Sequence, residues 1–509
     1  MDLLKLDVNQ TTRRVLESPL RGAKWNFAAG RKAKWDHQIV IFGAAESATG
    51  IKNMLGKLLD ESQVRAALRS NTQLSLVTSR GLVHVLRVAP SEDGESDYGR
   101  FRDLTGARFR ELFQECRRQK SASSIGVHLV GLNAEETLGA LVGIGLSHYS
   151  FRNVLRSRRD EQDPKLFFTS STGNIDRNLI DASHAIVSGM NLARHLANLP
   201  ASGANPQDLA QFFKNFFSGR RGLTVEVWDV ARIKKENMGL LLGVGNGSQW
   251  GARFVHLRYR PQGGSKRKPL AFVGKGVTFD SGGLDIKTAA GMRLMKKDMS
   301  GIAIMAGLCH FVTNMSLKTP CDFYLPLAEN SVSDRATRPG DVHLSRAGHY
   351  VEIDNTDAEG RLVMADAIDY AVTRKNADAP AALIDVSTLT GAMRVAVGLD
   401  VAGFFSNDDE LVAEAESAAQ KMGEMAWRMP LVKKYERELN SEYADFRNCS
   451  DSGFGGAITA ALFLQKFVRD TSWLHFDVMA WNKSPAGALS EGSNAQCFQI
   501  LAGMLLARE

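Results

Sequence analysis

Short apolar runs alternate with stretches of helical periodicity along the chain. In the first part, runs bounded by glycine and polar residues predict strands at 37–43 and 124–131, and a pair of strands within 74–88. Amphipathic stretches lie between them. This pattern favours an α/β unit over a series of hairpins.

The second part repeats the alternation after a long helical pattern at 178–199. Several of its strands are apolar nearly throughout, as expected of strands covered on both faces. Strands are predicted at 223–229, 252–259, 269–275, 381–389 and 473–479, and further helices at 301–312, 361–372 and 457–468. The boundary between the parts falls between about 160 and 185, and we place it at 170/171.

The composition is that of a packed globular protein. With 44% hydrophobic and 23% charged residues over 509 positions, it argues against disorder, collagen-like repeats and coiled coil. No apolar run approaches the ~20 residues of a membrane span, and the first residues lack the apolar core of a secretory signal. Five scattered cysteines without CxxC spacing predict free thiols. We therefore expect a cytoplasmic protein without a membrane segment.

The net positive charge of the chain arises entirely in its first third. Residues 1–170 carry 26 Lys+Arg against 19 Asp+Glu, whereas the remainder carries 37 of each. Such a bias could serve an anionic partner such as nucleic acid or an acidic surface of another subunit. Between Arg102 and Lys120, however, basic and acidic residues are interleaved at helical spacing, which indicates a solvated face.

The densest group of reactive side chains follows the strand at 269–275. The glycine-rich segment 273–301 contains Lys275, Asp280, Lys287 and Asp298. Loops at the ends of parallel strands are where α/β proteins commonly hold ligands. For any one of these residues alone, an ordinary exposed loop residue is the competing interpretation.

A second group lies in the segment 353–371. Asp357 and Glu359 are two residues apart, so in an extended segment both carboxylates point to one side. Gly360 would let the chain turn tightly into a helix beginning near Arg361. Carboxylates held together repel unless a cation neutralises them or they share a proton. Spacing alone leaves both a metal site and an acid/base pair open.

These two segments carry a family resemblance. GKGVTFDSGGLDIK and NTDAEGRL closely resemble the two signatures of the leucyl aminopeptidase family, the cytosol aminopeptidases. NLARHLANLPASGANP, DVSTLTGAM and GGAITAALFL also look like segments of that family. The resemblance is good over about 185–480. It implies a small N-terminal α/β domain, 1–170, and a larger catalytic α/β domain, 171–509, with a mixed, largely parallel sheet flanked by helices.

The resemblance implies a metal-dependent aminopeptidase that hydrolyses the N-terminal residue of peptides through a metal-bridging hydroxide. Two divalent ions are implied, zinc foremost, with manganese or magnesium able to occupy one site. Their ligands would be Lys275, Asp280, Asp298, Asp357 and Glu359. Lys287 would stabilise the oxyanion, and Arg361 would hold a bicarbonate that carries the proton. A lysine ligand must lose its proton, so Lys275 is expected to be neutral once metal is bound.

Specificity and assembly are implied less directly. The family pattern places Met295, Thr388 and Gly391 around the first side chain of the substrate and implies a broad, leucine-like preference. Met479 stands where the family usually has alanine, which affects the size of this pocket. The family is typically a homohexamer. Because some members also bind DNA, a DNA-binding accessory role for the basic N-terminal part is the alternative function.

Overall fold

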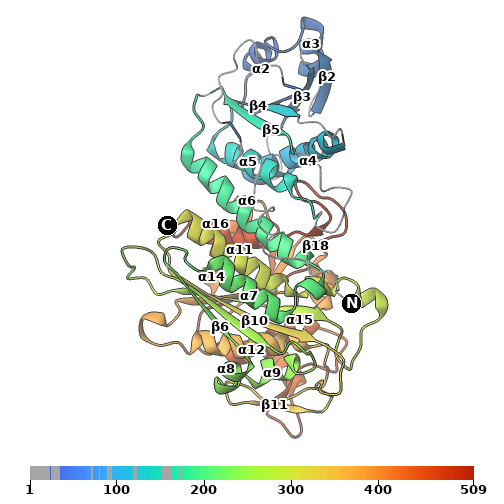
Figure 1. Ribbon diagram of the computed structural model, residues 1–509, viewed down its shortest axis with the longest axis vertical. Coiled ribbons are helices and arrows are strands. Elements are labelled where there is room, and N and C mark those ends of the chain that lie inside the picture. The colour runs from blue at the N-terminus through green and yellow to red at the C-terminus, as the bar shows by residue number, and fades with distance from the viewer. Residues whose placement is uncertain are drawn as a thin grey trace.

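The computed structural model describes residues 23–24, 35–69, 73–78, 81–88, 95–118, 123–151, 163–171 and 173–509. The two largest sheets follow each other along the long axis of the molecule, with the long helix α6 (Arg177–Asn198) running between them (Figure 1). In these ranges no helix has both the length and the apolar character to span a bilayer. The predicted α/β class is confirmed, and the strand pairs are mixed and largely parallel.

The N-terminal sheet has the strand order β2-β3-β1-β4-β5. β1 is parallel to β3 and β4, and β4 to β5, whereas β2 and β3 are antiparallel. Alternate residues of β1 enter different cores: Ile39 and Ile41 join α4 and α5, and Val40 and Phe42 join α2 and α3. The elements are β1 (His37–Phe42), α2 (Ala48–Leu55), α3 (Glu61–Arg69), β2 (Gln73–Thr78), β3 (Gly81–Arg87), α4 (Asp97–Arg118), β4 (Ser124–Val130), α5 (Ala134–His148) and β5 (Lys165–Ser170). The strands predicted here are confirmed.

The main sheet has the order β15-β14-β17-β13-β8-β10-β7-β6, and β9 pairs with β10. Its centre, from β17 through β13 and β8 to β10, is parallel. The strands are β6 (Leu223–Trp228), β7 (Arg253–Tyr259), β8 (Leu270–Gly274), β9 (Val277–Asp280), β10 (Cys321–Asn330), β13 (Ala382–Ser387), β14 (Ala402–Ser406), β15 (Ala426–Arg428) and β17 (Trp473–Asp477). All five strands predicted in this part are present.

Helices cover both faces of the main sheet (Figure 1). One face packs against α7 (Pro206–Phe217), α11 (Ser300–Met315) and α14 (Asp409–Lys421), and α6 and α16 (Phe498–Leu506) pack in turn against α11. The other packs against α8 (Val230–Lys235), α9 (Gly239–Gly245), α12 (Glu359–Val372), α13 (Gly391–Val397) and α15 (Gly456–Val468). The remaining elements are η2 (Ala201–Gly203), α10 (Ala289–Met292), η3 (Met295–Met299), β11 (Val342–Leu344), β12 (Tyr350–Glu352), η4 (Asn376–Asp378), η5 (Lys433–Leu439), β16 (Phe446–Arg447), β18 (Trp481–Asn482) and β19 (Gly492–Ser493).

The central strand β10 was not among the predicted elements. Its ten residues contain Pro326, a residue that cannot donate to a ladder and is unusual inside a central strand. On one side β10 pairs with β8 up to Tyr324 and with β9 from Ala328, so Pro326 lies where β10 changes partner on that side, while its pairing with β7 on the other side continues through Pro326. The strand therefore tolerates a proline that would interrupt a regular ladder.

The interpretation of residues 102–120 as a solvated basic face was wrong for part of α4. Arg102 is 7% exposed, and its guanidinium donates to the carbonyl oxygens of Met422 and Gly423, both at 2.9 Å. These carbonyls follow the C-terminus of α14, where a cation is favourable. Arg117 is equally buried and donates to Asp163 at 2.9 Å. Periodicity does not reveal such contacts between distant segments.

The predicted boundary at 170/171 follows the last strand of the N-terminal sheet. However, one cluster of buried apolar side chains extends from Ile39 in that sheet to Leu505 in α16. α6 packs against both α5 and α11, so the two parts share a core. The division into two separate domains stays a prediction.

Substitution of Arg102 tests the contact between α4 and the residues that follow α14. Arg102→Ala should lower the free energy of unfolding by about 2 to 4 kcal/mol, because the buried carbonyl of Met422 and the partly buried carbonyl of Gly423 lose a charged donor. Arg65→Ala is the control, since Arg65 is 64% exposed in its side chain and pairs only with Glu61 among the described residues. The control should change stability by less than about 0.5 kcal/mol. Equal urea midpoints for both variants would contradict the assignment.

Candidate metal centre and substrate cavity

The segments that follow neighbouring strands bring the two sequence motifs together. Lys275 directly follows β8, and Asp280 ends β9, which pairs with β10 beside it. Asp298 lies in η3, and Glu359 is the first residue of α12. These positions correspond to the ligand-holding edge of an open parallel sheet.

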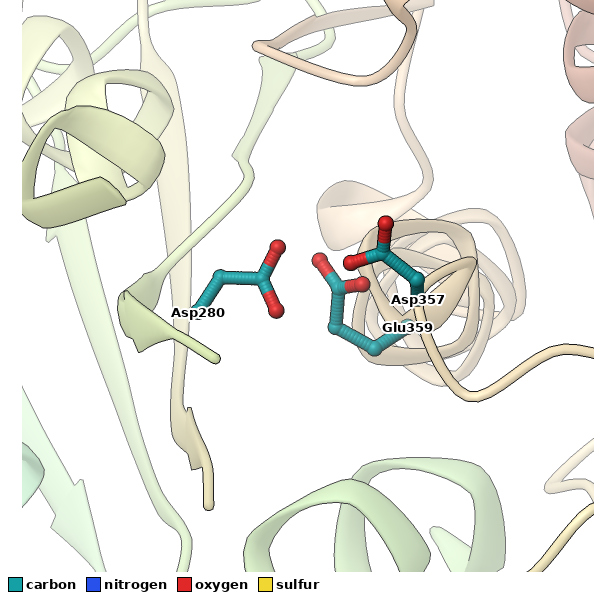
Figure 2. A group of neighbouring side chains, drawn as sticks. All are labelled: Asp280, Asp357 and Glu359. Atoms are coloured by element: carbon teal, nitrogen blue, oxygen red, sulfur yellow. The ribbon is translucent and has the colours of Figure 1, made fainter. Parts of the chain in front are cut away.

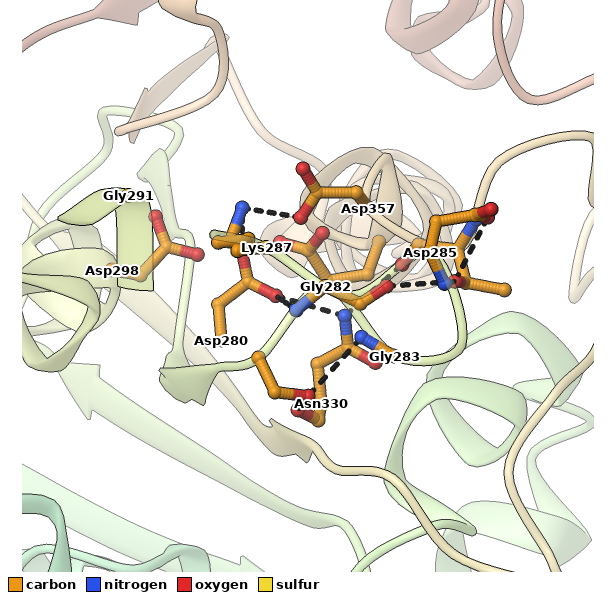
Figure 3. Close-up of polar contacts among 12 residues, drawn as sticks. Asp280, Gly282, Gly283, Asp285, Lys287, Gly291, Asp298, Asn330 and Asp357 are labelled. Carbon is orange, nitrogen blue, oxygen red and sulfur yellow. Dashed lines mark hydrogen bonds and ion pairs between the residues drawn. The ribbon is translucent and has the colours of Figure 1, made fainter. Parts of the chain in front are cut away.

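Two lysines connect four carboxylates in this cluster. Lys275 Nζ lies 2.7 Å from Asp298 Oδ2 and 2.9 Å from Glu359 Oε1. Lys287 Nζ lies 2.7 Å from Asp280 Oδ2 and also pairs with Asp357 (Figure 3). Each ammonium therefore pairs with one carboxylate from the segment 273–301 and with one from the segment 353–371.

Three of these carboxylates point toward one another. Oxygens of Asp280, Asp357 and Glu359 lie within 4.8 Å of one another, from β9 on one side and the start of α12 on the other (Figure 2). Glu359 is 2% exposed, and its Oε2 has no hydrogen-bond partner within the described part of the chain. An unsatisfied buried carboxylate oxygen is costly without a cation. Oxygen ligands at this spacing fit a hard or borderline divalent ion.

Gly360 serves a different purpose from the one predicted. It lies inside α12 rather than in a turn before the helix, because the helix already begins at Glu359. A Cβ at Gly360 would lie 2.3 Å from Cε and 2.5 Å from Nζ of Lys275. The glycine is needed so that the Lys275 side chain can pass against the helix and reach Glu359.

Neighbouring polar groups orient the carboxylates. Asp280 Oδ1 accepts hydrogen bonds from the backbone N–H of Gly282 and from Asn330 Nδ2, both at 2.9 Å (Figure 3). Asp298 Oδ1 accepts from the hydroxyl of Thr388 at 2.7 Å. Asn330 was not predicted from the sequence, because its role depends on the register of β10 beside β9. Thr388, predicted as a pocket residue, also fixes Asp298.

A cavity of about 420 Å³ opens over this cluster. Its lining includes the three residues predicted for the substrate pocket, Met295, Thr388 and Gly391, together with the unpredicted Lys297 and Arg394. Burial lowers the pKa of Lys297 to about 8. Lys297 could not be predicted as a cavity residue, because a lysine beside an aspartate is ordinary in a surface loop.

Arg361 lies behind the cluster, not among the residues that line the cavity. It is 7% exposed and donates from Nη1 to the carbonyl oxygen of Asn448 at 2.7 Å. Its Nε has no hydrogen-bond partner in the structure. Of the seven residues predicted as metal ligands or catalytic residues, Arg361 alone lies outside the ion-pair cluster.

Comparison with known proteins decides the family. The model of the cytosol aminopeptidase family, catalytic domain, matches residues 191–502. A Brucella anthropi protein named "Probable cytosol aminopeptidase" is 35% identical over 456 residues, 88% of this chain and 89% of that protein. A Nostoc punctiforme protein of the same name is 41% identical over 330 residues, 64% of this chain and 66% of that protein. The chain belongs to the cytosol aminopeptidase family.

Solved structures agree with this assignment. The cytosol aminopeptidase from Coxiella burnetii superposes with a TM-score of 0.76 at 31% identity, covering 94% of this chain and 98% of that one. The bottromycin maturation enzyme BotP in complex with Mn gives a TM-score of 0.80 at 28% identity, covering 94% and 100%. The protein is therefore a metal-dependent aminopeptidase of the α/β class, as the family resemblance of the motifs implied.

Burial and repulsion between neighbouring carboxylates set the protonation of the ion-pair cluster in this aminopeptidase. Burial, followed by repulsion from Asp280, raises the pKa of Glu359 well above its ordinary value and also raises the pKa of Asp357. Burial alone would lower the pKa of Lys275, but the carboxylates of Asp298 and Glu359 outweigh it and raise the pKa. Without metal, the cluster therefore retains protons that a cation would have to displace.

Metal affinity should accordingly rise with pH. Lys275 carries its proton at neutral pH, and the raised pKa values of Glu359 and Asp357 favour protonation of these carboxyl groups, so protons are displaced when a cation enters. For each proton released, affinity should increase about tenfold per pH unit. Calorimetric titration of metal-free protein with zinc between about pH 6 and 8, in buffers of different ionisation enthalpy, measures both quantities. Affinity independent of pH, with no proton release, would contradict this electrostatic account.

Proposed function

We propose that the aminopeptidase holds two divalent cations in the ion-pair cluster and hydrolyses the first peptide bond of a peptide there. Lys275, Asp280, Asp298, Asp357 and Glu359 would be the ligands. The single observation that carries this proposal is the convergence of three carboxylates within 4.8 Å around an unpartnered buried oxygen of Glu359. Zinc is the first candidate, and manganese or magnesium could occupy one site. The manganese of BotP supports a site open to more than one metal.

When bound, paired divalent ions activate water and polarise the scissile carbonyl. The chain's own residues would prepare the site for this chemistry. Lys275 must give up its proton to become a ligand, since an ammonium offers no lone pair. Asp280 and Asp298 keep their orientation through Asn330 and Thr388. Ligands held in this way need little rearrangement during the reaction.

Lys287 would act on the substrate. Its side chain is 16% exposed and reaches the cavity between Asp280 and Asp357. From there the ammonium can donate to the carbonyl oxygen of the scissile bond as that oxygen gains negative charge. The cavity lining supports access of the substrate to this ammonium.

Arg361 would hold bicarbonate, which would carry a proton to the leaving amine. The unpartnered Nε supports this assignment, because it leaves a guanidinium donor for an anion. Retention of the family motif around Arg361 is the second support.

The homohexamer and the cytoplasmic location are proposed from the family resemblance and from the name of the relatives. DNA binding remains the untested alternative. DNA binding was suggested by the basic charge of residues 1–170. However, Arg102 and Arg117 of α4 form hydrogen bonds within the protein. DNA affinity that falls steeply with added salt would be needed to support that role.

Asp357→Ala tests the proposed metal centre. The variant should fold, lose bound metal and lower the turnover of an N-terminal aminoacyl anilide by about 1,000-fold or more, because one ligand is lost. Metal content by mass spectrometry, circular dichroism and kcat/KM provide the measurements. Asp334→Ala is the control, since Asp334 is exposed and lies outside the cavity. Wild-type turnover by Asp357→Ala would remove this residue from the mechanism.

A further inference from the structure

Two cationic side chains in the substrate cavity have no ion-pair or hydrogen-bond partner among the residues that the structure describes. Lys297 directly precedes Asp298, is 6% exposed and lines the cavity. Arg394 lies in α13, is exposed and lines the same cavity. Throughout the described chain, neither side chain forms an ion pair or a side-chain hydrogen bond. Positive charge therefore extends from the buried wall of the cavity to its rim.

Two carboxylates, Asp298 and Asp477, attract the buried Lys297 ammonium electrostatically, but both are bound to other groups. Asp298 pairs with Lys275 at 2.7 Å. Asp477 accepts hydrogen bonds from the backbone N–H of Leu389 at 2.8 Å and from the hydroxyl of Thr390 at 2.6 Å. Both acids have structural partners, so neither provides the missing counter-ion at ion-pair distance.

A buried ammonium without a counter-ion is unfavourable once water leaves the cavity. A peptide that fills the cavity and displaces this water would therefore bind better if it places a negative group beside Lys297. The neutral walls formed by Met295 and Met479 can pack against the methylene groups of such a side chain. The unpaired positive charge would thus distinguish substrates by whether the side chain of their N-terminal residue ends in a negative, neutral or positive group.

We propose that this aminopeptidase prefers peptides with an acidic first residue, whose side-chain carboxylate binds Lys297 with Arg394 nearby at the rim. This inference rests on the proposed function, because it places the first side chain of the substrate in the same cavity. It differs from the leucine-like preference implied by the family resemblance. A leucine side chain would leave the ammonium unpaired, and a lysine side chain would be repelled by it.

The test compares kcat/KM of the metal-loaded enzyme for aminoacyl coumarinamides that carry Glu, Gln, Leu or Lys. Glutamine matches glutamate in shape but lacks the charge, so the Glu/Gln ratio isolates the ion pair. We expect Glu to exceed Gln by about 10- to 100-fold, the range of a charge-assisted hydrogen bond. Lys should be the poorest substrate.

Lys297→Met keeps the length of the side chain and removes the charge. This variant should reduce the Glu/Gln ratio to near one and improve turnover of Leu relative to Glu. Its unfolding midpoint should equal or exceed that of the wild type, because an unpaired buried charge is removed. Arg394→Met should lower the ratio less, since the exposed guanidinium is screened by solvent. Lys266→Met, in the exposed loop 261–268, is the control and should leave the ratio unchanged.

Three results would overturn the proposal: a wild-type Glu/Gln ratio near one, a preference for Leu, or a ratio that Lys297→Met does not change. If Leu or Gln is hydrolysed under those conditions, the proposed aminopeptidase function stands and only the acidic preference fails. If the metal-loaded wild type hydrolyses no substrate of the panel, the proposed function fails and the preference fails with it.

Discussion

Mutual repulsion among four carboxylates, three of them buried, is the constraint that organises this protein. Asp280, Asp298 and Glu359 are each at most 3% exposed, and only nearby cations make such a group stable. Lys275 and Lys287 supply that charge through four ion pairs. The same arrangement prepares the cluster for divalent ions, because a metal can replace ammonium groups as the source of positive charge.

The fold supplies the geometry that this constraint requires. Parallel strands β8 and β10, with β9 beside β10, end at one edge of the main sheet, and α12 begins there. The N-terminus of α12 also favours the negative charge of Glu359. Helices cover both faces of the sheet and exclude water from its apolar strands. Rigid strand ends thus hold side chains from segments that are distant in sequence.

Much of this could be predicted from the sequence, because the apolar strands and the two motifs are local signals. β10 could not, since Pro326 is acceptable only where the strand changes partner. Gly360 suggested a turn, but its lack of a side chain serves the passage of Lys275. Arg102 and Lys297 were missed for the same physical reason: their burial results from segments that meet only in the folded chain. Tertiary contacts decided these roles.

The most direct test of the metal centre is a crystal structure of zinc-loaded protein with anomalous diffraction at the zinc edge. Two anomalous peaks about 3.5 to 4 Å apart are expected. They should be surrounded by Lys275, Asp280, Asp298, Asp357 and Glu359, with the Lys275 ammonium no longer paired to Asp298. Fully loaded crystals with no peak in this cluster, and with both lysines still in their ion pairs, would contradict it.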